Sequence, residues 1–403
     1  MTKPMHIKIK ALRGKLLAPP SKSHGQRLLL LSSLTKSPLQ IHNLGQDKDS
    51  CAMQSAIDQI KNDSSKKHGA LYLGESGFAL RSLAFLGCHF YSAYSLNGTG
   101  TLKLREHLST IQLLEQLVLK VKHSNGILPI EISGQIEQKS LIVDGSQGSQ
   151  FISGLFFLAA VTPGKWQIEI QNLKSKPYLE LTLSVLEQAG FNYQKNGNAY
   201  FFEGAQELQL DDATVEGDWS SVAAFLVGAA IGGKIELVGL NSESWQPDRN
   251  ILHALTQFGA TVLWKEGILH VETTGQCHPF EFDCTQQPDL FPVLVVLACA
   301  AAGTSQIKGI DRLKNKESDR LKAMCEALNN WEVAFRINKN YIEIHGTGKV
   351  KSSLINTHND HRIAMAGAIA AFLCDDGQYL SEEKSVAKSY PAFFADLKTL
   401  TIC

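Results

Sequence analysis

The chain has 403 residues, and its 39 basic and 39 acidic side chains cancel to a formal net charge of zero. The length allows two or three domains with full cores, while the balanced charge argues against binding nucleic acid or a membrane surface through bulk charge. The longest strongly apolar stretch, 290–302, is interrupted by Pro292 and falls short of the roughly 20 residues that a membrane-spanning helix requires.

The N-terminus lacks the basic segment followed by an apolar one that marks a secretory signal, so we expect a cytoplasmic protein. The eight cysteines form no CxxC pair, and no histidine lies at zinc-site spacing from them. We therefore expect neither a structural zinc site nor a redox pair.

Six clusters of Gly, Ser, Asp and other polar residues each precede a run of small apolar residues. Their marker residues are Ser21, Glu75, Gly145, Gly217, Asp289 and Asp360, which are separated by 54, 70, 72, 72 and 71 positions. A nearly fixed period indicates one supersecondary unit used repeatedly. Each cluster has the composition of a helix start, where unpaired N–H groups and the positive end of the helix dipole favour anions. Together the six helix starts predict a site for a heavily charged small molecule.

Between the clusters, short β-branched strands alternate with helices. The runs 151–161 and 222–233 are apolar nearly all round, which predicts helices that are buried on every side. The segment 248–258 has the pattern of an amphipathic helix, and strands are predicted at 260–264 and 268–272 with a tight turn between them. This order predicts a βαβαββ unit in which one helix lies inside the domain and helices cover mixed sheets.

The first cluster places Ser21, Lys22, Ser23 and Arg27 close to a helix start. Because the next four residues are all leucine and draw the segment into the core, the two cations are expected to face an anion. The alternative is an ordinary helix in which a serine caps the N-terminus and the lysine is solvated.

The most charged segment is 314–321, where Lys316 lies four residues and Glu317 three residues before Arg320. This spacing predicts a shared helical face, and the cations suit a site for phosphate or carboxylate groups. An exposed helix with internal ion pairs is the alternative.

The sequence Asn-Asp-His-Arg at 359–362 precedes a helix of small apolar residues. Its asparagine or aspartate would cap the helix whatever the function. Arg362 at the mouth of a buried helix would require an anion, whereas a lone His361 is more often structural. Asp289 and Lys388, taken by themselves, have the features of a helix cap and a solvated lysine.

Taken together, these motifs resemble one family, the 3-phosphoshikimate 1-carboxyvinyltransferases or EPSP synthases, which are enolpyruvyl transferases. The resemblance spans positions 20–394 and depends on the order of ten motifs. In this sequence they are Ser21-Lys-Ser with Arg27, Gly74-Glu-Ser-Gly with Arg81, Arg105, Gly148-Ser-Gln, Ser175-Lys-Pro-Tyr, Glu216-Gly-Asp, Asp289, Lys316-Glu-Ser-Asp-Arg, Asn359-Asp-His-Arg and Lys388-Ser-Tyr-Pro.

The resemblance implies an α/β fold of two domains, each an inside-out α/β prism, with six βαβαββ-type repeats, three per domain. One domain would span 21–215, and the other would combine 1–20 with 216–403. The active site would lie in an interdomain cleft that closes on substrate and excludes water. The resemblance also implies a monomer.

The implied reaction transfers the enolpyruvyl group of phosphoenolpyruvate to the 5-hydroxyl of shikimate 3-phosphate and releases phosphate, in the shikimate pathway of aromatic amino-acid biosynthesis. It proceeds by addition and elimination without a metal or other cofactor. The family's roles imply that Asp289 is the base toward the 5-hydroxyl, Glu317 a proton donor to the methylene carbon and Lys22 a proton carrier. The residues implied around phosphoenolpyruvate are Lys22, Gly77, Arg105, Gln150, Arg320, Arg362 and Lys388. Those implied to hold shikimate 3-phosphate are Lys22, Ser23, Arg27, Ser149, Gln150, Ser175, Asp289 and Lys316.

Several positions depart from the family pattern. Glu75 and Phe78 stand where Asn and Thr are usual, and they lie beside Gly77, which governs access of the inhibitor glyphosate in the family. Gly77 implies that glyphosate competes with phosphoenolpyruvate, although the nearby Glu75 carboxylate leaves this open. Gly148 replaces the first serine of the SSQ motif, and Arg312 occupies a position that binds substrate in relatives.

Two other functions remain open at this point. The related enzyme that transfers the same group to UDP-N-acetylglucosamine usually has a Lys-Asn pair near its N-terminus, where this chain has Lys22 and Ser23. A non-catalytic regulatory protein that binds an anionic metabolite would not need both Glu317 as an acid and Asp289 as a base.

Overall fold

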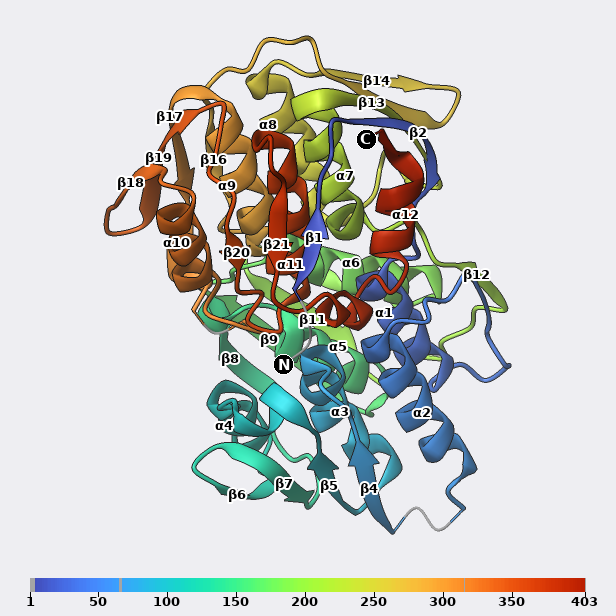
Figure 1. Cartoon of the computed structure of the whole chain (residues 1–403). Helices are drawn as coiled ribbons and strands as arrows, with labels where there is room; N and C mark the ends of the chain where they lie inside the picture. The colour runs from blue at the N-terminus through green and yellow to red at the C-terminus, as the bar shows by residue number, and fades with distance from the viewer. Residues whose placement is uncertain (1–3, 65–66, 315, 403) are drawn as a thin grey trace. The chain divides into compact units, whose positions relative to one another are not determined.

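The computed structural model describes residues 4–64, 67–314 and 316–402. The chain divides into two compact units, and Figure 1 colours the chain from blue to red along the sequence. The insert unit comprises residues 20–215, and the split unit comprises residues 1–19 with 216–403. These bounds differ from the predicted ones only in the assignment of Pro20.

Helices and strands alternate through the insert unit. In chain order they are α1 (Lys22–Ser32), β3 (Gln40–His42), α2 (Lys48–Asn62), β4 (His68–Tyr72), α3 (Gly77–Phe90), β5 (Ala93–Asn97), η1 (Gly100–Leu104), α4 (Leu108–Gln116), β6 (Lys120–Ser124), β7 (Ile127–Ser133), β8 (Ser140–Asp144), η2 (Gly145–Gln147), α5 (Gln150–Val161), β9 (Lys165–Gln171), α6 (Lys176–Gln188), β10 (Gln194–Asn196), β11 (Ala199–Glu203) and β12 (Asp212–Thr214).

The split unit takes two strands from the N-terminal segment and the rest from the C-terminal half. Its elements are β1 (Met5–Ile7), β2 (Ala11–Leu17), α7 (Trp219–Gly232), β13 (Gly233–Val238), η3 (Pro247–Asn250), α8 (Ile251–Phe258), β14 (Thr261–Lys265), β15 (Ile268–Glu272), β16 (Glu281–Asp283), η4 (Pro288–Leu290), α9 (Phe291–Ala300), β17 (Ala302–Lys308), η5 (Ile310–Arg312), α10 (Arg320–Asn330), β18 (Ala334–Ile337), β19 (Tyr341–Thr347), β20 (Leu354–Ile355), α11 (His361–Ile369), η6 (Ala370–Leu373), β21 (Gln378–Leu380), η7 (Lys384–Lys388), α12 (Phe393–Leu400) and β22 (Thr401–Ile402).

Four sheets repeat one strand order. They contain β4-β5-β7-β6, β8-β9-β11-β10, β2-β13-β15-β14 and β16-β17-β19-β18, with β22 added beside β2. In each of them the first two strands are parallel and the remaining pairs are antiparallel. The parallel pair requires a crossover, and the last two strands form a hairpin. This is the predicted βαβαββ unit.

The other two sheets are abbreviated copies of the same βαβαββ repeat. In the insert unit β12 pairs in parallel with β3, and in the split unit β20 pairs in parallel with β21, which pairs antiparallel with β1. Both copies are completed by a strand from the opposite end of their unit's sequence. The local hairpin is therefore absent from the described residues of these two copies, because the chain enters or leaves the unit there.

The helices that follow the six polar clusters form the interiors of the units. Every residue of α9 is buried, and in α5 the whole stretch 151–160 is buried. Figure 1 shows α7, α9 and α11 side by side, and these three helices contact one another. In the insert unit α3 and α5 approach so closely that a Cβ on Gly154 would lie 2.7 Å from the Arg81 carbonyl oxygen. The prediction that all-round apolar helices are buried inside the domains is confirmed for α5, α7 and α9.

The finer sequence predictions differ at element boundaries. The predicted helix 248–258 is a short 3₁₀ turn followed by α8, the predicted strand 260–264 is β14 one residue later, and the predicted strand 268–272 is β15. Among the described residues, no helix is both long enough and apolar enough to cross a membrane.

Candidate functional site

The centre of the split unit's polar cluster is one buried guanidinium, that of Arg320 at the start of α10. Its side chain is only 1 % exposed. Nη1 lies 2.7 Å from Asp289 Oδ1, Nη2 lies 2.8 Å from Glu317 Oε2, and Nε lies 2.9 Å from Asp360 Oδ2. Burial disfavours the charged form of Arg320, but the three carboxylates outweigh it and hold the pKa of the guanidinium above its usual value.

Asp360 connects two of the sequence motifs. Its fully buried side chain caps α11 by accepting a hydrogen bond from the Arg362 backbone N–H at 2.9 Å. It also accepts from the Ser318 hydroxyl at 3.0 Å and from Arg320. The capping role was predicted, but its second role as the buried partner of Arg320 was not, because the two residues are 40 positions apart.

Asp289, in η4, has two cations against the same oxygen. Lys316 Nζ lies 3.3 Å from its Oδ1, the atom that also accepts from Arg320. Burial raises the pKa of this carboxyl, but the charges of Lys316, Arg320 and Arg362 have the larger combined effect and hold its pKa well below the usual value. The carboxylate is therefore ionised at neutral pH, as a proton acceptor must be.

The prediction that Lys316 and Arg320 share a helical face is wrong. The helix α10 begins at Arg320, after Asp319 as its N-cap, so that Lys316 and Glu317 precede it in a bend. The two cations are brought together by a common carboxylate, that of Asp289 from another segment, rather than by helical spacing.

Arg362 lies at the start of α11, and its side chain is nearly buried. Nη1 donates to the Ser220 carbonyl oxygen at 2.6 Å, while the buried Nε has no hydrogen-bond partner among the described residues. Lys388 ends η7, which packs on α11, and is also buried rather than solvated. His361 is buried beside Asp360, with its Nδ1 3.8 Å from Asp360 Oδ1.

A second cluster forms in the insert unit around Gly77, the first residue of α3. A Cβ placed on Gly77 would lie 3.0 Å from Arg81 Nη1 and 3.9 Å from both Arg105 Nη1 and Gln150 Oε1. Arg81 Nη1 donates to Gln150 Oε1 at 2.6 Å. Three residues predicted around one substrate therefore converge in the structure. Arg81 joins them, although it was noted only as part of a motif.

The positive charge of this cluster affects the pKa of the buried His107. Its pKa is lowered to about 4, first by burial and then by the neighbouring charges of Arg81 and Arg105. The imidazole is therefore neutral near pH 7, and the cluster presents its positive charge through the two arginines.

Lys22 opens α1 and is held by a carboxylate from the next helix. Its Nζ lies 3.1 Å from Asp49 Oδ2, and the two side chains are only 17 % and 8 % exposed. Lys22 is thus fixed near the first turn of α2, and the alternative of a freely solvated lysine is not what the structure shows. Asp49 was not predicted, because the pairing joins residues 27 positions apart.

Arg27 lies one turn further along α1 and is buried without a carboxylate partner among the described residues. Nε donates to Thr182 Oγ1 at 2.8 Å, Nη1 to the Ser23 carbonyl oxygen at 2.6 Å and Nη2 to the Tyr178 carbonyl oxygen at 2.9 Å. Its Cζ lies 4.5 Å from the centre of the Phe78 ring. Burial lowers the pKa of Arg27 to about 9.

Two further predicted residues of the insert unit occupy the positions directly before helices. Ser149 is the N-cap of α5 and Ser175 that of α6, and both are buried. Gly148 adopts φ +116°, a conformation that a residue with a Cβ rarely adopts. In this chain the position therefore favours a glycine over a serine. In the split unit Arg312 donates from Nη1 to the Thr285 carbonyl oxygen at 3.1 Å.

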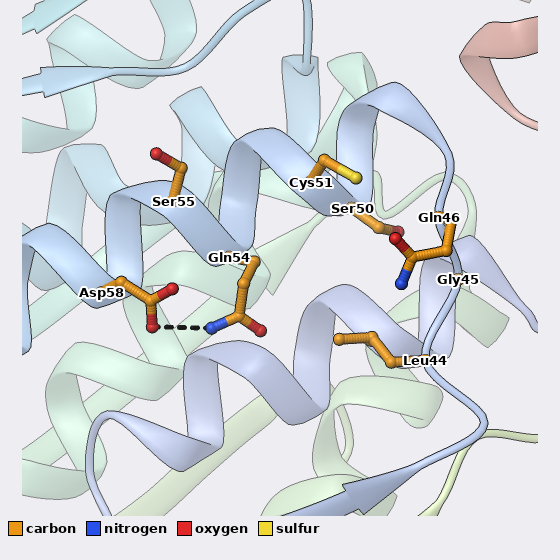
Figure 2. A pocket seen from close by; sticks show the side chains of 8 residues that line it. All are labelled: Leu44, Gly45, Gln46, Ser50, Cys51, Gln54, Ser55 and Asp58. Atoms are coloured by element: carbon orange, nitrogen blue, oxygen red, sulfur yellow. Dashed lines mark hydrogen bonds between the residues drawn. The ribbon is translucent and has the colours of Figure 1, made fainter.

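Two shallow pockets are lined by residues outside both clusters. One, of about 290 Å³, is lined by α2 and the loop before it (Figure 2). There Gln54 Nε2 donates to Asp58 Oδ1 at 2.7 Å. The other, of about 250 Å³, lies between α8 and the segment 281–287. Neither contains a predicted site residue. Among the residues described, no group of three or more His, Cys, Asp or Glu side chains is arranged to hold a metal ion.

Comparison with known proteins gives a consistent result. The sequence profile described as EPSP synthase (3-phosphoshikimate 1-carboxyvinyltransferase) matches residues 7–397. A 3-phosphoshikimate 1-carboxyvinyltransferase of Aeropyrum pernix is 31% identical over 96% of this chain and 93% of the relative, and one of Thermococcus kodakarensis is 33% identical over 96% and 98%. The fold matches that of an EPSP synthase from Acinetobacter baumannii, with a TM-score of 0.80 over 99% of this chain and 98% of that one at 21% identity. It also matches the enolpyruvyl transferase NikO from Streptomyces tendae, with a TM-score of 0.75 over 98% and 96% at 14% identity.

Proposed function

Because the chain belongs to the EPSP synthase family, we propose that it transfers the enolpyruvyl group of phosphoenolpyruvate to the 5-hydroxyl of shikimate 3-phosphate and releases phosphate. The observation that carries the proposal is the family match over residues 7–397. Two clusters that contain cationic side chains lie within the matched region and support it, because the two substrates together bear two phosphates and two carboxylates.

In the addition step, a proton is added to the methylene carbon of phosphoenolpyruvate, and the 5-hydroxyl oxygen bonds to its central carbon as the hydroxyl proton leaves. We assign Asp289 as the acceptor of that hydroxyl proton and Glu317 as the donor to the methylene carbon. Asp289 is ionised because of its cationic neighbours. A substrate anion that drew Lys316 or Arg320 away from Asp289 would weaken this stabilisation and make the carboxylate a stronger base.

In the elimination step, the methyl group formed by the addition loses a proton and the carbon–oxygen bond to phosphate breaks, which leaves the enol ether product. We assign Lys22 as a proton carrier and charge stabiliser in these steps. Its ion pair with Asp49 holds the ammonium group in a defined position. Preorganised cations of this kind stabilise charge that develops in the transition state.

Binding of phosphoenolpyruvate is assigned to the cluster around Gly77 in the insert unit and to the cations of the split unit. The binding residues are Lys22, Gly77, Arg105, Gln150, Arg320, Arg362 and Lys388. Shikimate 3-phosphate is assigned to Lys22, Ser23, Arg27, Ser149, Gln150, Ser175, Asp289 and Lys316. For Arg27, the proposal requires an anion to add to, or replace, the three protein oxygens that now accept its hydrogen bonds. We further propose that the chain acts as a cytoplasmic monomer.

The proposal is tested by measuring phosphate release from phosphoenolpyruvate with and without shikimate 3-phosphate. We expect release only when both are present, and loss of turnover in Lys22→Ala and Arg320→Ala. Arg336→Ala, which removes an exposed arginine from β18, is the matched control and should retain activity. Equal release without shikimate 3-phosphate, or release that requires UDP-N-acetylglucosamine instead, would contradict the proposal.

In the same assay glyphosate should compete with phosphoenolpyruvate, because Gly77 leaves the space beside Arg81 and Arg105 open.

A further inference from the structure

The loop that carries Arg105 is held to the start of α3 by successive hydrogen bonds. The Leu73 N–H donates to the Asn97 carbonyl oxygen at 2.9 Å, and the Thr99 N–H donates to the Gly74 carbonyl oxygen at 2.8 Å. The next contact in this series is made by a side chain: the Thr101 N–H donates to Glu75 Oε2 at 3.3 Å. The Glu75 carboxylate therefore adds one more contact to the series of backbone hydrogen bonds between these two segments.

The same carboxylate orients the hydroxyl of Thr101. Thr101 Oγ1 lies 3.4 Å from Glu75 Oε2 and accepts a hydrogen bond from Arg105 Nη2 at 2.8 Å. A hydroxyl has one proton and two lone pairs. The carboxylate can only accept hydrogen bonds, so the hydroxyl proton points toward it. A lone pair of the hydroxyl oxygen then accepts a hydrogen bond from the guanidinium of Arg105.

The backbone at Gly100 makes room for this arrangement. A Cβ there would lie 2.4–2.6 Å from the carboxyl atoms of Glu75, and Gly100 has φ +53°. The carboxyl group of Glu75 occupies the space that a side chain at position 100 would fill. The contact is thus built into the η1 segment, which leads directly to Arg105.

We propose that Glu75 is a positioning residue, which acts through Thr101 to fix the guanidinium of Arg105 beside Gly77 and Arg81. The inference rests on the proposed function in one respect, that Arg105 binds phosphoenolpyruvate. Arg105 Nη2 is bonded to Thr101 while its Nη1 faces the Gly77 side, where Arg81 and Gln150 meet. Glu75 thus contributes to affinity for phosphoenolpyruvate without acting on the reacting atoms.

The test compares Glu75→Ala and Glu75→Gln with Glu115→Ala, which removes an exposed carboxylate from α4 in the same unit. For Glu75→Ala we expect the KM for phosphoenolpyruvate to rise roughly 10-fold while kcat and the KM for shikimate 3-phosphate change by less than about 2-fold, the pattern of a lost binding interaction. Glu75→Gln retains an oxygen that accepts from the Thr101 N–H, so it should restore part of the affinity. Glu115→Ala should behave as the wild type.

A double-mutant cycle with Thr101→Val tests whether Glu75 acts through Thr101. If it does, Glu75→Ala should add little to the rise in KM that Thr101→Val causes alone. Fully additive effects, an unchanged KM in Glu75→Ala, or a fall in kcat at constant KM would each overturn the inference. A fold defect alone would lower the yield of active enzyme and leave KM unchanged.

Amide hydrogen exchange separates this inference from the proposed function. In Glu75→Ala the Thr101 amide should exchange faster, while the amides in the centre of α3 keep their protection. If the wild type releases no phosphate in the presence of shikimate 3-phosphate, the proposed function is refuted. The positioning role of Glu75 is then decided by the hydrogen-exchange result alone. Unchanged protection of the Thr101 amide in Glu75→Ala would contradict that role.

Discussion

Two arginines, one in each unit, are almost fully buried, but their hydrogen-bond partners differ in charge. Arg320 in the split unit contacts the carboxylates of Asp289, Glu317 and Asp360. Arg27 in the insert unit contacts a hydroxyl and two carbonyl oxygens. The pKa of Arg320 is raised by its carboxylates, while burial lowers the pKa of Arg27 to about 9.

The difference indicates different roles in binding an anionic substrate. Burying a cation without a carboxylate partner costs free energy, and a bound anion offsets this cost. A phosphate bound to Arg27 would therefore be strongly stabilised. Arg320 already has its counter-charges, and a substrate anion must compete with them. In the proposed binding of phosphoenolpyruvate to Arg320, the gain would therefore be offset by the displacement of carboxylates, among them that of the proposed base Asp289.

The largest expected effect on stability is that of Asp360→Asn. Asp360 is the fully buried one of the three carboxylates around Arg320, and its replacement leaves the buried guanidinium with two partly exposed partners. The free energy of unfolding should fall by about 3–5 kcal/mol, as when a buried ion pair is broken. Thr182→Val, which removes a neutral partner of Arg27, should cost only about 1–3 kcal/mol. Urea unfolding at pH 7 measures both. Glu272→Gln, which weakens the exposed pair with Lys234, is the control and should cost less than about 1 kcal/mol. Equal losses for Asp360→Asn and Thr182→Val would remove the distinction between the two arginines.

A smaller effect is expected in the pH dependence that His107 confers. The pKa of His107 is about 4 in the folded protein, whereas an unperturbed histidine has a pKa of 6.5. The unfolded chain therefore binds a proton first as the pH falls. Stability should therefore decrease between about pH 6.5 and pH 4, by up to about 3 kcal/mol. His107→Gln should lack this contribution in urea unfolding over that range. In Arg105→Ala the contribution should shrink, because one of the charges that lower the pKa is gone. A difference between the wild type and His107→Gln that does not vary with pH would refute this explanation.

The sequence predicted the features that depend on local pattern. All-round apolar runs such as 151–161 indicated the buried helices, and the regular spacing of the polar clusters indicated the repeated unit. The two abbreviated copies were not predicted, because β12 and β1 pair with strands far away in the sequence. Nothing in the residues around 212–214 or 5–7 marks them as substitutes for a local hairpin.

Within the site, the sequence predicted residue types better than partners. Lys22, Arg320 and Arg362 were predicted to face anions, but the carboxylates of Asp49 and Asp360 that hold the first two in place were not predicted as site residues. These pairs join positions 27 and 40 residues apart. Periodicity describes neighbours within one helix or strand, so it says nothing about such contacts. The same limit explains the incorrect prediction of a helical face at 316–320.

The central claim is that the carboxylate of Asp289 performs chemistry while Arg27 and Arg105 of the insert unit provide affinity. The most direct measurement is the steady-state kinetics of Asp289→Asn, with phosphoenolpyruvate and shikimate 3-phosphate varied in turn. We expect kcat to fall by about 100- to 10,000-fold, the usual contribution of a general base, while the KM for phosphoenolpyruvate changes little. A kcat close to that of the wild type, with the loss confined to KM, would contradict the claim.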